Sequence, residues 1–234
     1  MTRPRDTRMP ELQRPPWVWA WAIVATGALG LFAIYGAWDG IPDPFPTHWN
    51  ARGEADSFSE KTWGNMILMF GLLSGILAIV AAGSFALIHQ TAKHQRGEDW
   101  KIARARAMSN SMLKPLGMWM FLLNAVIVFD IYLSITQVYS SFALLIAVII
   151  IVVIGLMWNV VHIQKWLDEH YPDPKTSKHM KWGIFYYNPD DPNMMVHREL
   201  NSTFNMAHPG SWVAMGALIG MPIILVAVLI ILGL

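Results

Sequence analysis

Residues 17–38 read WVWAWAIVATGALGLFAIYGAW, an apolar run without a charged side chain, and this stretch decides the fold class. A bilayer core about 30 Å thick requires about 20 apolar residues in a helix. Trp17, Trp19, Trp21 and Trp38 lie toward the two ends of the run, where aromatic side chains reach headgroup depth. The run therefore predicts a transmembrane helix.

Four further runs of this kind follow, at 63–89, 116–139, 142–163 and 212–234. Hydrophobic residues make up 54% of the 234 residues and charged residues only 14%, a balance typical of polytopic membrane proteins. The polar sequence SITQVYSS separates the third run from the fourth and predicts a tight turn between antiparallel helices. We therefore expect an all-α polytopic membrane protein with five transmembrane helices.

The basic residues predict the direction of these helices. Of 17 Lys and Arg, 4 precede the first helix, 2 lie in the first connection, 6 in the second and 5 in the fourth. Alternate segments thus hold 15 and 2 basic residues. The positive-inside rule therefore places the N-terminus in the cytoplasm and the C-terminus outside. A cleaved signal peptide is the alternative for the first run, but the run is long and lacks an A-x-A site, so we expect a retained anchor.

This topology divides the chain into segments with separate roles. The segments are a cytoplasmic tail (1–16), a helix-loop-helix unit (17–89) with an extracytoplasmic loop (39–62), a basic cytoplasmic loop (90–115), a transmembrane hairpin (116–163), a cytoplasmic segment (164–211) and a last transmembrane helix (212–234).

The composition also restricts the chemistry. The chain contains no cysteine, which excludes a disulfide, a thiolate nucleophile and a thiolate metal ligand. It lacks a glycine-rich phosphate loop, a nucleophile beside a base and a carboxylate pair at catalytic spacing. We therefore expect a protein that is not an enzyme and that has no cofactor.

The first connection, IPDPFPTHWNARGEADSFSEK (41–61), is too polar to enter lipid. Its three prolines predict a stiff, extended start without a hydrogen-bonded ladder. Asn50 and Gly53 are turn formers, and Asp56 or Ser57 could cap a short helix before Lys61. We expect an ordered loop.

The spacing of this loop resembles the DUF1648 domain, a pattern like "lP…iPtHfn..G..d…sK" after a first transmembrane helix, found in membrane proteins of the SdpI type. The matching positions are Pro42, Pro46, Thr47, His48, Asn50, Gly53, Asp56 and Lys61. The resemblance implies a bacterial cell-membrane protein whose relatives give immunity against a secreted toxin and can hold a transcription repressor at the membrane.

Two interpretations of the loop remain open. In the first, it binds a partner outside the membrane through Pro46, His48, Asn50, Gly53, Asp56 and Lys61. In the second, the same polar groups satisfy the backbone of a compact loop. A zinc site needs three or four ligands, and the external side offers a single histidine, so we expect no metal.

The second connection, 90–115, is basic, and from Glu98 its apolar residues recur with an approximate helical period. We expect a short amphipathic helix that binds anionic lipid on the inner leaflet, in preference to a site for a partner or for nucleic acid.

The fourth connection contains KWGIFYYNPDDPNMMVHRELNSTFNMAHPGSW (181–212), in which aromatic and β-branched runs are bounded by Asn, Asp and Pro. Such runs predict a small hairpin or meander on the cytoplasmic side. The segment resembles DUF5808, which implies no biochemical activity. We expect it to bind a partner through Trp182, Tyr186, Asn188, Asp190 and Asp191. The adjacent aspartates could hold a divalent cation, but a capped turn is the favoured interpretation.

Four polar groups, Asn124, Asp130, Asn159 and His162, lie inside the predicted transmembrane hairpin, and the first three are candidate intramembrane sites. We expect Asn124 and Asn159 to hydrogen-bond each other as a packing device. Asp130 is hydrated if the hydrocarbon ends near Tyr132 and buried if it ends near Tyr139, and the length of the span favours the first.

Small residues mark one face of each of the first two helices, and small residues let helices approach closely. They are Gly27, Gly30 and Gly36 in the first helix and Gly71, Ser74, Gly75, Ala78, Ala82 and Gly83 in the second. We expect these faces to pack on each other or on another subunit.

Two functions fit these observations. The first is a non-enzymatic, SdpI-like immunity, toxin-resistance or envelope-stress protein whose partners are membrane lipids and a toxin peptide. The alternative is an accessory subunit of a larger membrane complex, such as a respiratory oxidase supercomplex. A transporter is disfavoured because the spans show neither an internal repeat nor broken helices.

Overall fold

The computed structural model describes residues 9–50, 54–137, 142–197 and 202–232, with backbone alone at 142–145 and at most positions from 219 onward. The chain divides into two compact units. We call residues 16–86 and 114–156 the hairpin unit, and residues 1–15, 87–113 and 157–231 the network unit.

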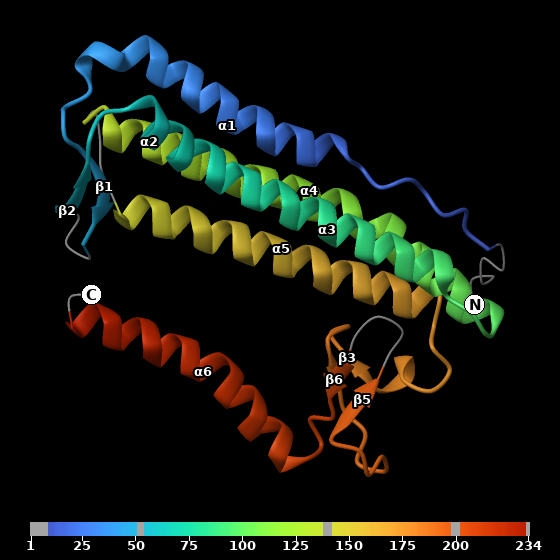
Figure 1. The fold of residues 1–234 in the computed structure, drawn as a ribbon. Helices are drawn as coiled ribbons and strands as arrows, with labels where there is room; N and C mark the ends of the chain where they lie inside the picture. The colour runs from blue at the N-terminus through green and yellow to red at the C-terminus, as the bar shows by residue number, and fades with distance from the viewer. Residues whose placement is uncertain (1–8, 51–53, 138–141, 198–201, 233–234) are drawn as a thin grey trace. The chain divides into compact units, whose positions relative to one another are not determined.

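The described chain is mostly helical, with three small two-stranded sheets (Figure 1). The helices are α1 (Val18–Ala37), α2 (Trp63–Ile67), a π-helical turn (Leu68–Leu72), α3 (Leu73–His94), α4 (Asp99–Ile135), α5 (Phe142–His170) and α6 (Pro209–Leu232). The strands are β1 (Phe45–Trp49), β2 (Ala55–Ser59), β3 (Met180–Lys181), β4 (Phe185–Tyr186), β5 (Met195–His197) and β6 (Ser202–Phe204). Short 3₁₀ turns cover Trp38–Gly40 and Ser177–His179.

Four helices among the described residues are long and apolar enough to cross a membrane: Val18–Gly40, Trp63–His94, Asp99–Ile135 and Ile146–His170. They indicate a membrane protein, because a helix satisfies its own backbone groups where water is absent. The fifth expected span coincides with α6, much of whose side-chain structure lies outside the described residues. That span stays a prediction, as does the direction of all the helices.

Helices α4 and α5 form the expected antiparallel hairpin. In the hairpin unit, a Cβ added at Gly155 of α5 would overlap the ring of Trp119 on α4. In the network unit, Arg104 near the start of α4 contacts Asp168 near the end of α5. Residues early in one helix therefore meet residues late in the other. The turn between the helices includes residues 138–141, which lie outside the described residues.

The predicted basic loop at 90–115 is instead almost entirely helical. Helix α3 continues to His94, and α4 begins at Asp99 and runs without interruption through Pro115. The prediction of a separate amphipathic helix on the lipid surface is therefore wrong. Proline removes one backbone donor, but Leu113 and Gly117 on either side of it are buried, and this packing offsets the lost bond.

The first connection is a β-hairpin, not an extended rod followed by a short helix. Strand β1 contains Pro46 and pairs with β2 in antiparallel register, with irregularities on either side of His48. Proline is tolerated because a two-stranded sheet has an edge at each strand, where a backbone donor is not required. The prediction of a small hairpin or meander on the 181–212 segment is confirmed by the β3–β4 and β5–β6 pairs.

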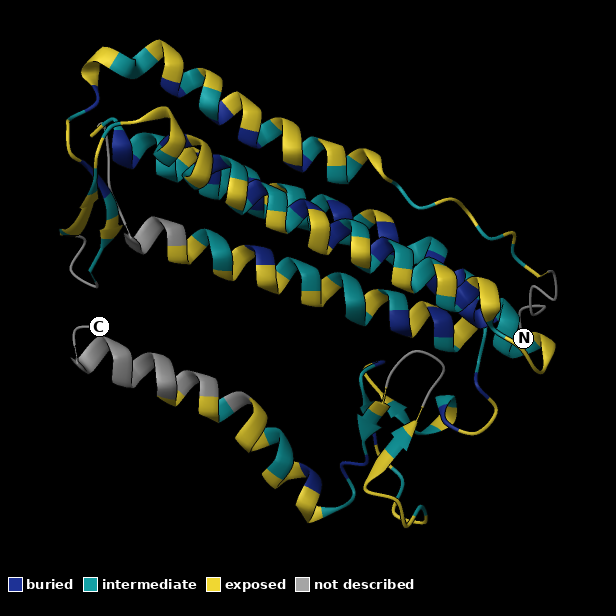
Figure 2. Ribbon diagram, viewed as in Figure 1, coloured by how far each residue is buried: buried dark blue, intermediate teal, exposed yellow. Residues whose placement is uncertain are grey.

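The core of the hairpin unit joins the β1–β2 hairpin to the helices (Figure 2). Its buried members come from α1, the connection, α2, the π-helical turn and α4: Ile34, Ile41, Phe45, Met66, Phe70, Val128 and Ile135. Phe45 at the start of β1 thus fixes the base of the hairpin to the helical bundle.

Glycines bring α1 directly against the π-helical turn and the start of α3. A Cβ added at Gly27 would lie 2.6 Å from Ser74 Oγ, and one added at Gly30 would lie 2.6 Å from Phe70 Cδ1. The expected small-residue packing is therefore present on α1 at these two positions. Gly36, Gly75 and Gly83 have nothing within 4 Å of such a Cβ, so their faces are not used within the described chain.

One of the polar groups inside the spans, Asn124, has a backbone partner on α1. Asn124 is fully buried and donates from Nδ2 to the carbonyl of Ile23 on α1, at 3.2 Å. Asn159 belongs to the other compact unit, so the expected bond between Asn124 and Asn159 stays a prediction. Asn159 and Asp130 are each half-buried, on α5 and α4 respectively.

Candidate functional site

The β1–β2 hairpin is closed at its tip by Asn50 and Glu54. Asn50 N donates to Glu54 O at 2.9 Å, Glu54 N donates to Asn50 Oδ1 at 3.1 Å, and Asn50 Nδ2 donates to Glu54 Oε2 at 3.1 Å. These three bonds make Asn50 a hairpin-closing residue. Gly53, another residue of the predicted site, lies outside the described residues.

A histidine–carboxylate pair crosses the middle of the hairpin. His48 Nδ1 and Asp56 Oδ1 are 2.6 Å apart, and both side chains are exposed. Cross-strand polar pairs of this kind stabilise a two-stranded sheet modestly and hold its register. Among the predicted site residues of this segment that the structure describes, His48 and Asp56 are the exposed ones. Pro46, by contrast, is buried opposite Phe58.

Lys61 fastens the end of the hairpin to the end of α1. Its Nζ donates to the carbonyls of Trp38 at 3.3 Å and Ile41 at 2.9 Å, and its backbone N donates to Asp43 Oδ1 at 3.0 Å. The ammonium also lies 5.5 Å from the centre of the Trp38 ring, within cation–π range. The last carbonyls of a helix have no partner within the helix, and Lys61 supplies one.

The residues that follow complete this junction. Thr62 Oγ1 accepts a hydrogen bond from Asn65 N at 3.2 Å and so caps α2. Trp63 stacks on Trp38 with the ring centres 4.4 Å apart and the planes 11° from parallel. The geometry thus favours the architectural interpretation for Asn50 and Lys61, because their polar groups are used within the loop itself.

A groove of about 400 Å³ runs from the hairpin along the second span. Thr47, Ser59 and Asn65 line its polar end, and five apolar residues continue it across the π-helical turn: Leu68, Met69, Leu72, Leu73 and Ile76. A π-helical turn inserts an extra residue into a helix and often marks a functional site. Of these residues only Thr47 belonged to the sequence motif, since the apolar run gives no sign of a π-helical turn.

The segment that contains β3 to β6 is organised around Asn205, which is completely buried. Its Nδ2 donates to the carbonyls of Asn188 at 2.8 Å and Asp191 at 3.2 Å, and its Oδ1 accepts from Asn188 N at 3.0 Å and Ala207 N at 3.2 Å. A buried amide with four such bonds fixes the NPDDPN turn. The sequence did not single out Asn205, although Asn205 lies shortly before the start of α6 in a segment that contains several asparagines.

The carboxylate of Asp191 is occupied by donors from its own turn. Oδ1 accepts from Asn193 N and Nδ2, each at 2.9 Å, and Oδ2 accepts from the Tyr186 hydroxyl at 3.2 Å. The backbone bond from Asn193 is the main cause that lowers the pKa of Asp191. Burial raises the pKa of Tyr186, so the phenol stays a donor.

The neighbouring aspartate closes the same turn. Asp190 N donates to Asn188 Oδ1 at 3.1 Å, and Asn188 Nδ2 donates to the Tyr186 hydroxyl at 3.1 Å. No group of three or more His, Cys, Asp or Glu suited to a metal is found among the described residues. The geometry therefore favours a capped turn at Asp190 and Asp191 over a cation site.

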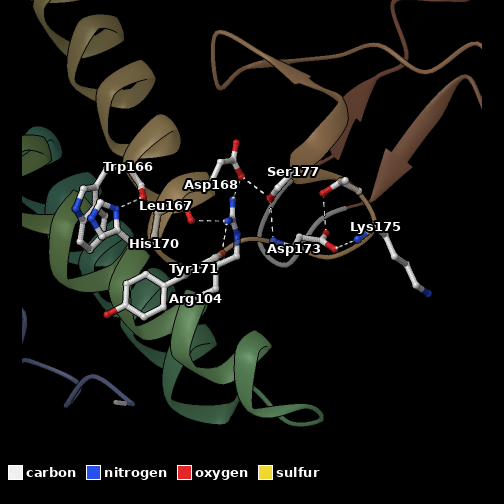
Figure 3. A network of polar contacts seen from close by, with 10 residues as sticks. Arg104, Trp166, Leu167, Asp168, His170, Tyr171, Asp173, Lys175 and Ser177 are labelled. Carbon is white, nitrogen blue, oxygen red and sulfur yellow. Dashed lines mark hydrogen bonds and ion pairs between the residues drawn. The ribbon is translucent and has the colours of Figure 1, made fainter. Parts of the chain in front are cut away.

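A buried arginine joins the two long helices of the network unit (Figure 3). Arg104 is 1% exposed and donates to the carbonyls of Leu167 at 3.0 Å and Tyr171 at 2.6 Å, and to Asp168 Oδ1 at 2.8 Å. The sequence predicted a lipid-bound amphipathic helix for the 90–115 segment, whereas the side chain of Arg104 in this segment is buried in the protein. A guanidinium is well suited to cap the carbonyls at a helix C-terminus while it pairs with a carboxylate.

The network continues from Asp168 into the turn after α5. Ser177 Oγ donates to Asp168 Oδ1 at 2.7 Å and accepts from Asp173 N at 2.8 Å. Asp173 in turn accepts from Lys175 N at 2.8 Å and from Thr176 Oγ1 at 2.7 Å. The turn at 173–177 that leads into β3 is thus bonded to the end of α5 and, through it, to α4.

Comparison with known proteins identifies one part of the chain. Residues 17–73 match the family model described as "Domain of unknown function (DUF1648)". The match covers α1, the β1–β2 hairpin, α2 and the π-helical turn, and it confirms the DUF1648 resemblance of this part. No curated protein and no solved structure matches the chain.

Proposed function

We propose that this chain is a non-enzymatic membrane binding protein of the SdpI type, which protects a bacterial cell by binding a membrane-active toxin peptide. The observation that supports it best is the groove beneath the β1–β2 hairpin, polar at Thr47, Ser59 and Asn65 and apolar along the second span. An amphipathic peptide carries both kinds of surface. The DUF1648 match over 17–73 contains most of this groove.

The proposal depends on the predicted topology. The positive-inside rule directs the N-terminus to the cytoplasm and so brings the hairpin to the outer face, where a secreted toxin arrives. It assumes five spans, with α6 as the fifth, and a DUF5808-like segment on the cytoplasmic side. Under this topology the protein belongs to the bacterial plasma membrane.

The chemistry of the groove sets the expected binding mode. Hydroxyl and amide groups at its polar end can hydrogen-bond a peptide backbone, and the apolar residues can accept the apolar face of a short helix. Burial of apolar area contributes about 25 cal/mol per Å², so about 200 Å² of contact would contribute about 5 kcal/mol before the costs of binding. The hairpin, fixed by Lys61 and Phe45, contributes Thr47 and Ser59 to one wall of this site.

Cells that lack the gene test the proposal, with resistance to membrane-active peptide toxins as the readout. We expect increased sensitivity, restored by the unaltered chain and not by Ile76→Trp, which fills the groove. Ile79→Trp is the matched control, because Ile79 lies one turn further along α3, is exposed and does not line this groove. Unchanged sensitivity without the gene, or equal rescue by both variants, would remove the proposal.

A second candidate is an accessory subunit of a larger membrane complex, such as a respiratory oxidase supercomplex. It is favoured by the open glycine face of the second span, where Gly75 and Gly83 have nothing within 4 Å of an added Cβ. Small residues of this kind let a foreign helix approach closely. Gentle detergent extraction and native gel separation test it, and migration at the mass of the single 26.4 kDa chain would contradict it.

A further inference from the structure

The three-residue connection between β3 and β4 carries an unusual side chain. Trp182 has φ +54° and Gly183 has φ +77°, and Ile184 N donates to Lys181 O at 3.2 Å to close the turn. Positive φ at both central residues is the signature of a type I′ turn, which prefers Asn, Asp or Gly at the first of them. A tryptophan there adopts a backbone conformation that bulky residues disfavour.

Contacts with the part of the chain that the structure describes do not account for this choice. The Trp182 side chain is 70% exposed, and its ring contact is an edge-on approach to Phe185 at 6.1 Å. An asparagine would form the same turn without strain. A strained residue is kept where the surroundings or a function require it, so the exposed indole itself is the feature to be explained.

The tip of the turn lies against α5. A Cβ added at Gly183 would lie 3.0 Å from Lys165 Cγ, 3.0 Å from Lys165 N and 3.2 Å from Val161 O. Glycine is therefore needed at 183 for space as well as for its φ. This close approach fixes the turn, and with it the indole of Trp182, to the last third of α5.

That part of α5 is where its apolar sequence ends. Met157 and Trp158, 51% and 65% exposed, are one turn before Val161 and lie on the same face of the helix as Val161 and Lys165, because residues three and four apart are neighbours on a helix surface. On a candidate membrane span, such an exposed apolar face is directed to lipid. The turn therefore lies where this face changes from apolar to charged.

The charges beside the indole match a headgroup layer. Lys181 precedes Trp182 and Lys165 contacts Gly183, and both side chains are exposed. Tryptophan is enriched at the boundary between hydrocarbon and water, and lysine beside it is attracted to anionic phosphates. An indole with lysines on both sides is suited to this boundary.

We propose that Trp182 is a membrane anchor, held by the strained β3–β4 turn in the phospholipid headgroup region next to α5, with Lys165 and Lys181 contacting lipid phosphates. The partner is the lipid surface itself. The inference concerns whichever leaflet receives the end of α5, so it does not depend on the proposed toxin binding or on the direction of the helices.

Trp182→Asn tests the anchor, because asparagine suits the turn and removes the indole. Both chains are reconstituted in vesicles of phosphatidylcholine and phosphatidylglycerol, with bromine on the acyl chain near the headgroup or near the methyl end. The wild-type minus variant difference isolates the emission of Trp182 from that of the other tryptophans. Unchanged far-UV circular dichroism verifies that the variant is folded.

We expect a difference emission that is quenched strongly by the shallow bromines, weakly by the deep bromines and little by aqueous iodide. Trp100→Phe supplies the reference for an indole in a polar surrounding, since the Trp100 indole N–H donates to Glu98 in the turn between α3 and α4. A Trp182 component that resists both bromolipids and is quenched by iodide like the Trp100 component would overturn the proposal.

Discussion

Arg104 allows the sharpest quantitative test of how the network unit is held together. Replacement by alanine removes the partner of Asp168 and the donor to two carbonyls at the end of α5. Loss of one partner from a buried ion pair costs about 3–5 kcal/mol. Asp168 retains the Ser177 hydroxyl and is 13% exposed, so we expect a value near the lower end, about 3 kcal/mol.

The assay is reversible unfolding in mixed micelles, combined with hydrogen exchange of the amides at 171–180. Arg104→Ala should lower the unfolding free energy by this amount and raise exchange in the turn that follows α5, because that turn is bonded to Asp168 through Ser177. Arg104→Lys should recover only part of the loss, since an ammonium lacks the planar fork that reaches both carbonyls and the carboxylate.

Two controls make the result decisive. Arg106→Ala removes another arginine side chain, which donates to Pro10 O at 3.4 Å. This substitution should lower the unfolding free energy by less than about 1 kcal/mol. Arg104→Met combined with Asp168→Leu removes both charges and should be less destabilising than Arg104→Ala alone. Equal effects of Arg104→Ala and Arg106→Ala would refute the reasoning.

Three further predictions concern the hairpin unit and the NPDDPN turn. Lys61→Met should raise hydrogen exchange in β1 and lower the unfolding free energy by about 1–3 kcal/mol, because two carbonyls near the end of α1 lose a charged donor. Lys93→Met is the control and should have little effect, because Lys93 is an exposed lysine on α3. Gly30→Val should lower the unfolding free energy by about 1–3 kcal/mol through overpacking on Phe70. Gly36→Val should not, because nothing lies within 4 Å of a Cβ added at Gly36. Equal losses of unfolding free energy in the two variants would contradict the packing of α1. The folded-state pKa of Asp191 is lowered, so the carboxylate contributes to stability above the ordinary carboxyl pKa of 3.8, and this contribution is lost as the pH falls through the lower folded-state pKa. Hydrogen exchange of the amides at 186–193 should therefore become faster, relative to the intrinsic rate, only in that acidic range. A loss of protection that begins at higher pH would contradict the prediction.

The hairpin unit shows which parts of a motif are used for architecture. Asn50 and Lys61 belong to the sequence pattern, and both direct their polar groups into the loop. His48 and Asp56 lie on its surface. A test of partner binding is therefore more informative at His48 and Asp56, where a substitution leaves the hairpin closure and its anchor in place.

The sequence by itself determined the helical class, the four spans that the structure describes and the separation of α4 from α5. These features follow from local properties, because an apolar run of sufficient length forms a helix in lipid whatever its neighbours are. The DUF1648 pattern was readable for the same reason, since its residues lie at fixed spacing along one segment.

Only the tertiary structure decided how the polar residues are used. Arg104 and Asp168 are 64 residues apart in the chain, as Asn124 and Ile23 are 101 apart, and no periodicity within one helix shows that such groups meet. The same holds for the groove over the π-helical turn and for the Trp182 turn against α5, because each depends on two segments that come together only after folding. Local sequence sets which elements form, whereas burial and hydrogen bonding between distant segments set which of their side chains are structural and which face a partner.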